Sequence, residues 1–404
     1  MTPQREDQAD QTREEPVIAR IAFVSSYPPR RCGIATFTQD LSSATGDREI
    51  VALDTGEHHL PYSLEVHHRI RRDEYSDYGR AALVLARCVK AVSIQHEFGI
   101  WGGTDGRYVL DFVDALTIPA VTTLHTILRE PTADQRAILS ELVARSDATV
   151  VMSRSAATVL ATVYGVDANK LDVVPHGVPD LPLVDPSSVK AGLGVEGLDI
   201  VLSFGLLGPG KGLELALDAL PAVVARHPAV CYVIVGATHP ELVRLEGEAY
   251  RSRLEAQVEG LGMRDHVRFV DRFVGRVELT RWLEAADVFV TPYPKLDQIV
   301  SGTLSYAMGA GRAIVSTPYT YAAELLADGR GVLVEPGSPE SLAIALNDIL
   351  GDPELRSALG RRAHAYSRRM VWSAVGDAYR AVFDRVTGSA STSRASATLA
   401  AVGA

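Results

Sequence analysis

The sequence contains little cysteine, and its three cysteines, Cys32, Cys88 and Cys231, are scattered and odd in number. They lack metal-ligand spacing, so we expect reduced thiols rather than a disulfide framework or a zinc site. No stretch approaches the roughly 20 consecutive apolar residues of a membrane-spanning helix. The polar, acidic N-terminus also lacks the apolar core of a signal peptide. These absences predict a cytoplasmic location with at most peripheral membrane contact.

Positive charge is also scarce, because the formal net charge is -10. A phosphate backbone requires a basic face, so this balance argues against nucleic acid as a partner. One local exception is the run from Arg69 to Arg72, with Arg30 and Arg31 earlier in the chain. Such a patch is either solvated surface or a contact for an anionic acceptor or a membrane surface.

The length of 404 residues exceeds one ordinary hydrophobic core, so we expect two domains of similar size. In both halves, short apolar runs alternate with helical patterns, which predicts two parallel sheets covered by helices on both faces. Proline, glycine and serine interrupt this pattern near 179–197, where we place the linker. The expected division is an N-terminal domain over 17–182, a C-terminal domain over 183–370 and a last helix over 371–387. Tails at 1–16 and 388–404 are expected to be disordered.

The individual elements follow from the same patterns. In the first domain we expect strands at 18–24, 50–53, 91–95, 120–124, 148–152 and 171–174, and helices at 78–89, 105–116 and 133–145. In the second we expect strands at 200–204, 230–235, 267–270, 288–290, 313–317 and 331–334, and helices at 213–225, 277–285, 302–308 and 339–350.

Polar residues follow several of these strands, at the sheet edge where ligands bind in parallel α/β proteins. His125 ends a strand of the first sheet, where a histidine can donate a hydrogen bond to a sugar hydroxyl or pass a proton. His96 and Glu97 follow an earlier strand, and Glu97 is placed to position an acceptor hydroxyl. For all three residues the alternative is an ordinary structural role.

Two turns in the second half are typical of phosphate binding. In GLLGPGKG (205–212), four glycines let the backbone approach a ligand, and Lys211 places a cation at the start of a helix. No serine or threonine follows the lysine, so the magnesium-ATP chemistry of a P-loop is not implied. Ser301, Gly302 and Thr303 begin a short helix whose N–H groups can hold phosphate oxygens. An ordinary strand-to-helix connection is the alternative for either turn.

In their order and spacing, these segments resemble the retaining, nucleotide-sugar-dependent glycosyltransferases of family 4, which have the GT-B fold. YPPRRCG is similar to the family's YPPxxGG, PHGV to its PNGV, and FGLLGPGKG to its donor loop VGRLxPxKG. YVIVG, ADVFVTPY and GVLVEPGSPESLA also match, so the resemblance spans 18–386. It implies an α/β protein of two Rossmann-like domains facing each other across a cleft. The acceptor would bind the first domain and the donor the second, and the last helix would cross back to the first.

The resemblance also implies roles for individual residues. Lys211 would neutralise the donor diphosphate, and His125 would lie near the transferred sugar, as the two catalytic residues. The donor-binding residues would be Gly33, Gly205, Lys211, Gly212, Gln298, Ser301, Gly302 and Thr303. His96 and Glu97 are acceptor-binding candidates, and Glu324 aligns with the glutamate of the family's GGxPE segment. The family uses neither metal nor cofactor, and the sequence offers no DxD carboxylate pair at a strand end.

The sequence departs from the family at several positions. The donor-loop arginine is Leu206 here, so one diphosphate cation is missing. Gln298 and Tyr306 replace the two glutamates of the E-x7-E motif. Gln298 can still hydrogen-bond sugar hydroxyls without a charge. Cys32 replaces a glycine of YPPxxGG, and His176 replaces the asparagine of PNGV. The donor's base and sugar therefore do not carry over.

The main hypothesis is a retaining, metal-independent hexosyltransferase with a nucleoside diphosphate sugar as donor. It would transfer a mannosyl or glucosyl unit to a hydroxyl of a glycan, a small molecule or a lipid-linked acceptor. A nonhydrolysing sugar-nucleotide epimerase of the same fold is an alternative, but it needs acid/base carboxylates, for which Glu97 is the candidate. A degenerate GT-B protein that binds a sugar nucleotide or glycan without turnover is the other alternative.

Overall fold

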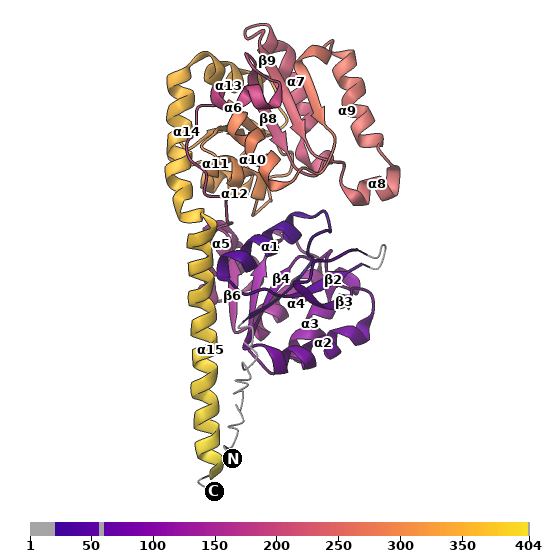
Figure 1. The fold of residues 1–404 in the computed structure, drawn as a ribbon, viewed down its shortest axis with the longest axis vertical. Helices are drawn as coiled ribbons and strands as arrows, with labels where there is room; N and C mark the ends of the chain where they lie inside the picture. The colour runs from indigo at the N-terminus through magenta and orange to yellow at the C-terminus, as the bar shows by residue number, and fades with distance from the viewer. Residues whose placement is uncertain (1–20, 56–59, 403–404) are drawn as a thin grey trace, which may run out of the picture.

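The computed structural model describes residues 21–55 and 60–402. Two α/β domains lie one above the other along the long axis of the molecule (Figure 1). Helix α14 (Pro353–Ser367) lies beside the C-terminal domain, and α15 (Trp372–Val402) continues past the N-terminal domain. Within the described part of the chain, no helix is both long and apolar enough to cross a membrane.

Both sheets are parallel throughout, as the alternation of strands and helices predicted. The first contains β1 (Ile21–Ser25), β2 (Glu49–Asp54), β3 (Val66–Arg71), β4 (Ala91–His96), β5 (Ala120–Leu124), β6 (Ala148–Val151) and β7 (Leu171–Val173), ordered β3-β2-β1-β4-β5-β6-β7. The second contains β8 (Asp199–Phe204), β9 (Val230–Val235), β10 (Val267–Val270), β11 (Val288–Thr291), β12 (Ala313–Ser316) and β13 (Val332–Leu333), ordered β10-β9-β8-β11-β12-β13.

Helices connect most of the successive strands and cover the sheets, whereas no helix is described between β2 and β3. The N-terminal domain contains α1 (Gly33–Thr45), α2 (Tyr75–Cys88), α3 (Tyr108–Asp114), α4 (Ala133–Arg145) and α5 (Arg154–Tyr164). The C-terminal domain contains α6 (Ser187–Lys190), α7 (Leu213–Val224), α8 (Pro240–Glu246), α9 (Ala249–Gly260), α10 (Arg276–Ala285), α11 (Gly302–Gly309), α12 (Thr320–Leu325), α13 (Pro339–Gly351) and α14. Side-chain caps start several of them, including Thr132 in a capping box at α4 and Ser301 at α11.

Several elements differ from the prediction. Strand β3 was missed because it is an edge strand in which only Ile70 is fully buried, so it has no apolar run. The basic run that includes Arg69 is therefore part of this strand, and Arg71 forms an ion pair with Asp77 at 2.8 Å. Helices α5, α8, α9 and α14 were also not predicted. Residues 18–20 and the tail at 1–16 lie outside the described residues.

The last helix is longer than predicted and packs on the N-terminal domain. It does not end at 387 but continues to Val402, so residues 388–402 are helical rather than a disordered tail. Its apolar face, with Val375, Tyr379 and Phe383, joins the core formed by β1 and β5. The hydroxyls of Tyr379 and Thr123 are 2.9 Å apart. Burial of this face fixes the helix against the first domain.

Candidate active site

Three of the predicted donor-binding residues are joined by one chain of hydrogen bonds. Lys211 Nζ donates to the hydroxyl of Tyr293 at 3.2 Å, and this hydroxyl lies 3.0 Å from Thr303 Oγ1. Thr303 Oγ1 in turn lies 3.1 Å from Ser301 Oγ, which accepts the N–H of Leu304. The chain joins the loop after β8 to the start of α11, the two turns predicted to hold phosphate.

Tyr293 links the two turns, although its sequence position after β11 gave no sign of this role. Its ring stacks on Tyr319 with centroids 5.0 Å apart, and Lys211 Nζ lies 4.6 Å from its centroid. Burial raises the pKa of Tyr293, but the charge of Lys211 and hydrogen bonds from Thr303, Lys211 and Ser301 outweigh it and lower the pKa. The ammonium of Lys211 thus favours the ionised form of this hydroxyl, as a nearby opposite charge does.

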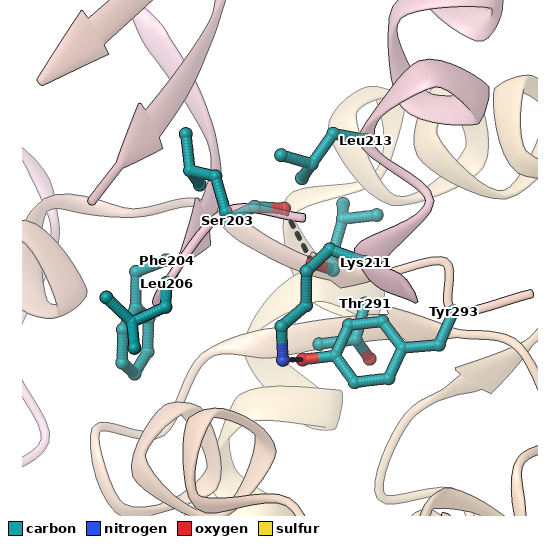
Figure 2. A pocket seen from close by; sticks show the side chains of 9 residues that line it. Ser203, Phe204, Leu206, Lys211, Leu213, Thr291 and Tyr293 are labelled. Carbon is teal, nitrogen blue, oxygen red and sulfur yellow. Dashed lines mark hydrogen bonds between the residues drawn. The ribbon is translucent and has the colours of Figure 1, made fainter. Parts of the chain in front are cut away.

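A small cavity of about 10 Å³ lies beside Lys211, enough for about one water molecule. Figure 2 shows the Lys211 side chain extended beside the ring of Tyr293, with Leu206 and Phe204 on the other side of the cavity. Leu206 thus presents an aliphatic side chain where the related family has a cation. Within the described residues, Lys211 is the one basic residue that lines this cavity.

The predicted glycines serve different purposes. Gly212 has φ +62°, and a Cβ there would lie 2.0 Å from the carbonyl oxygen of Pro292. Gly302 faces His176, whose Nε2 would be 2.9 Å from an added Cβ. Gly205 has φ +128°, whereas nothing lies within 4 Å of a Cβ built on Gly33. Gly212 and Gly302 are therefore required for packing, whereas the start of α1 at Gly33 is open.

His125 lies at the end of β5, as predicted, and is held in one orientation. Its Nε2 lies 2.9 Å from Gln95 Oε1, and Gln95 Nε2 donates to Ser93 Oγ at 3.1 Å. Burial, with smaller contributions from His176 and another histidine, lowers the pKa of His125 to about 3. The imidazole is therefore neutral at pH 7. Since Gln95 Oε1 accepts from Nε2–H, His125 Nδ1 is left as an acceptor.

The two acceptor-binding candidates differ in accessibility. His96 is fully buried, and neither ring nitrogen has a hydrogen-bond partner within the described residues. Glu97 is partly exposed, and its carboxylate accepts the N–H of Gly99 at 2.8 Å. Burial raises the pKa of Glu97, partly offset by backbone hydrogen bonds and by Arg30. In this conformation Glu97 is accessible to an acceptor, and His96 is not.

Aromatic contacts connect His125 to the start of α11. The Phe37 ring centroid lies 4.8 Å from that of His125 and 5.1 Å from that of His176. His176 Nδ1 lies 2.8 Å from the carbonyl oxygen of Gly177, and its Nε2 faces Gly302 at the start of α11. Two side chains, those of Phe37 and His176, therefore lie between the predicted catalytic histidine and the predicted phosphate-binding helix.

Gln298 and Tyr306, which replace the two glutamates of the E-x7-E motif, have different hydrogen-bond partners. Tyr306 Oη donates to Asp40 Oδ2 at 3.0 Å, and Arg276 Nη1 lies 2.8 Å from the other oxygen of Asp40. Asp40 belongs to α1, so Tyr306 links the domains, and its hydroxyl is not free for a ribose in this conformation. Gln298 Nε2 donates to the carbonyl of Val300 at 2.8 Å. Its amide therefore supports the loop that precedes α11.

Glu324 also joins the two domains. Its carboxylate accepts the N–H groups of Arg154 and Ser155, at 3.0 and 2.8 Å, at the start of α5. A carboxylate at a helix N-terminus is stabilised by the unpaired N–H groups and the helix dipole. The segment that aligns with GGxPE therefore has a structural role at the domain interface. No sequence pattern pointed to α5 as its partner, because α5 was not predicted.

Three buried histidines, His96, His125 and His176, predict a loss of stability in acid. Burial lowers the pKa of His96 and His125 to about 3 and that of His176 to about 4. The unfolded chain binds protons at these positions near pH 6.5, but the folded chain does not, so stability falls as pH decreases below about 6.5. Each histidine contributes about 2 kcal/mol of this loss at pH 5. We expect the melting temperature to fall steeply between pH 6.5 and 5.

A pair of variants separates this effect from ordinary acid denaturation. His96→Leu removes a buried titrating group, so the pH dependence of its melting temperature should be shallower than that of the wild type. His68→Gln is the comparison variant, because it removes a partly exposed histidine outside this buried group, 3.9 Å from Glu49. Equal dependence in His96→Leu and wild type would show that His96 does not titrate as the burial predicts.

Two parallel α/β domains that meet through α1, α5 and α15, with phosphate-type turns on the second, define the GT-B fold. Residues 188–366 match the family described as glycosyl transferases group 1, and residues 33–180 match glycosyltransferase family 4. The chain therefore belongs to glycosyltransferase family 4, as the motifs indicated.

Individual proteins agree with this assignment. The chain is 31% identical to the D-inositol 3-phosphate glycosyltransferase of Xylanimonas cellulosilytica over 300 residues, 67% of each chain. It is 30% identical to the enzyme of that name from Segniliparus rotundus over 280 residues, 65% of this chain but only 60% of that relative. The crystal structure of Anabaena HepE in complex with UDP and glucose has a TM-score of 0.72 at 17% identity, covering 91% of this chain and 100% of HepE. This structural match confirms the GT-B fold.

Proposed function

We propose that the protein is a retaining hexosyltransferase that uses a nucleoside diphosphate sugar and needs no metal. A mannosyl or glucosyl unit would pass to a hydroxyl of a glycan, a small molecule or a lipid-linked acceptor. The observation that carries the proposal is the hydrogen-bonded chain Lys211–Tyr293–Thr303–Ser301 beside the start of α11. The names of the relatives, and the UDP and glucose bound by HepE, support a nucleotide-sugar donor.

The proposed roles follow from where charge develops during the reaction. As the bond from the sugar to the diphosphate breaks, negative charge grows on the phosphate oxygens. Lys211 and the N–H groups at Ser301–Thr303 would stabilise this charge. The neutral ring of His125 would orient the sugar by accepting a hydroxyl hydrogen at Nδ1. No enzyme nucleophile is needed, because the leaving phosphate can assist the acceptor hydroxyl on the same face of the sugar.

Contacts between the two domains would also assist sugar transfer. Tyr306 and Glu324 connect the second domain to α1 and α5 of the first. Such contacts would hold the domains together around the reactants, which excludes water and limits hydrolysis of the donor. Glu97 would position the acceptor hydroxyl from the end of β4.

A panel of UDP, GDP and ADP sugars tests the proposal. A ligand that binds the folded protein raises its melting temperature by mass action. The stabilising donor is then incubated with candidate acceptors, including inositol phosphates, and the anomeric configuration of the product is determined by NMR. An inverted product would overturn retention, and a requirement for metal after chelation would overturn metal independence.

One observation favours a second candidate, a GT-B protein that binds a sugar nucleotide without turnover. Leu206 and Tyr306 replace charged residues of the family, and Tyr306 is already bonded to Asp40. Stabilisation by a donor without transfer to any acceptor or to water would support this alternative. Exchange of the hydrogen at C2 of the sugar would instead indicate the epimerase.

A further inference from the structure

Arg30 has a buried guanidinium nitrogen without a partner. Its Nη1 is inaccessible to solvent and forms no hydrogen bond within the described part of the protein. An unpaired charged donor away from water is unfavourable, so such a group usually has a ligand. The proposed mechanism gives Arg30 no role, although its loop follows β1 at the edge of the sheet that faces the second domain.

The loop holds Arg30 in place. The Arg30 N–H donates to the carbonyl of Tyr27 at 3.1 Å, which forms a turn. Cys32 Sγ lies 3.4 Å from Ser26 Oγ, which ties the two ends of the loop together. Beyond Cys32, helix α1 begins at Gly33 with open space around it. Arg30 therefore lies three residues before the unobstructed N-terminus of α1, where an anion is stabilised.

The charges of Arg30 and Lys211 both act on one residue of the second domain, His239. Burial lowers the pKa of His239, which precedes α8 in the second domain; the charge of Glu241 partly offsets this, and the charges of Lys211 and Arg30 lower the pKa further. Both cations therefore act on the same residue, one from each domain. Arg30 also acts on Glu97 within its own domain.

We propose that Arg30 supplies, from the N-terminal domain, the diphosphate cation that Leu206 does not provide. The inference rests on the proposed function, because it assigns a residue to the same donor. Each phosphate of the donor carries a negative charge, and the donor loop offers Lys211 alone. A guanidinium can donate two parallel hydrogen bonds to phosphate oxygens. Because Nη1 has no hydrogen-bond partner within the described residues, a change of the Arg30 rotamer that brings this nitrogen to the phosphate breaks no hydrogen bond at Nη1. Diphosphate binding would thereby draw the two domains together.

The test compares binding of UDP, GDP and ADP with binding of the corresponding monophosphates by calorimetry. Arg30→Gln should weaken binding of the preferred diphosphate about 10- to 100-fold, and the monophosphate much less. Arg31→Gln is the matched control, because Arg31 is adjacent and exposed, and it should bind like the wild type. Arg30→Lys keeps the charge and should recover part of the affinity.

A second substitution identifies what Arg30 binds. If it replaces the missing donor-loop cation, Leu206→Arg should restore diphosphate affinity in the Arg30→Gln background. Unchanged diphosphate binding in Arg30→Gln would overturn the inference. It would also be overturned if Arg30→Gln raised only the KM for the acceptor, and not that for the donor, and if Leu206→Arg did not reverse this change. A wild-type protein that binds none of these nucleotides would instead overturn the proposed function, and this inference with it.

Discussion

Replacing Lys211 with methionine is expected to reduce kcat/KM for sugar transfer about 100- to 1,000-fold, the range found when one group that stabilises developing charge is removed. Methionine keeps most of the aliphatic stem over the ring of Tyr293, so the main change is the lost charge. Leu206 provides no second cation in the same loop. The loss should therefore appear in kcat at saturating donor as well as in donor KM.

The control for this variant is Lys295→Met, an exposed lysine in the loop between β11 and α11. It makes the same chemical change a few residues from the site and should leave kcat/KM near the wild-type value. Melting temperatures of both variants show whether folding is intact. Transfer by Lys211→Met at the wild-type rate with saturating donor would remove Lys211 from the catalytic role.

Apolar patterns predicted the elements that form the sheets. The strands at 120–124, 230–235 and 267–270 and the helix at 133–145 have the predicted bounds. The strands at 120–124 and 230–235 are buried throughout, and buried parallel strands are apolar on both faces. Two of the missed elements bury few residues, although α5, α9 and α14 were also missed and bury four residues each. Strand β3 buries one residue fully, and α8 has no buried residue. A pattern search cannot separate such segments from loops, since burial of an apolar face gives the signal it reads.

Some residues of the candidate site were also predicted from the sequence, and others were not. Motif spacing identified Lys211, Ser301 and Thr303, which the fold brings into one hydrogen-bonded chain. It did not identify Tyr293, because a tyrosine after a strand is most often core, and its link to Lys211 spans 82 residues. It also gave no partner for Tyr306, because Asp40 lies 266 residues away in the other domain. Contacts between domains depend on docking, which no local pattern encodes.

Gly212→Ala is expected to have the largest effect on stability, lowering the free energy of unfolding by about 2–5 kcal/mol. Gly212 has φ +62°, a left-handed conformation that costs a residue with a Cβ about 1–2 kcal/mol. The added Cβ would also lie 2.0 Å from the carbonyl oxygen of Pro292, in the backbone that leads to Tyr293. The two loops must then separate, which moves Lys211 away from Tyr293. Transfer activity should fall together with stability.

The matched control is Gly210→Ala in the same loop. Nothing lies within 4 Å of a Cβ built on Gly210, and its φ is not in the left-handed region. The substitution should change the free energy of unfolding by no more than about 0.5–1 kcal/mol. Any change should be an increase, because alanine reduces the conformational entropy of the unfolded chain. Urea midpoints of the two variants measure the difference. Equal midpoints would show that the close packing of Gly212 on Pro292 does not hold the donor loop, and that the loop can shift without cost.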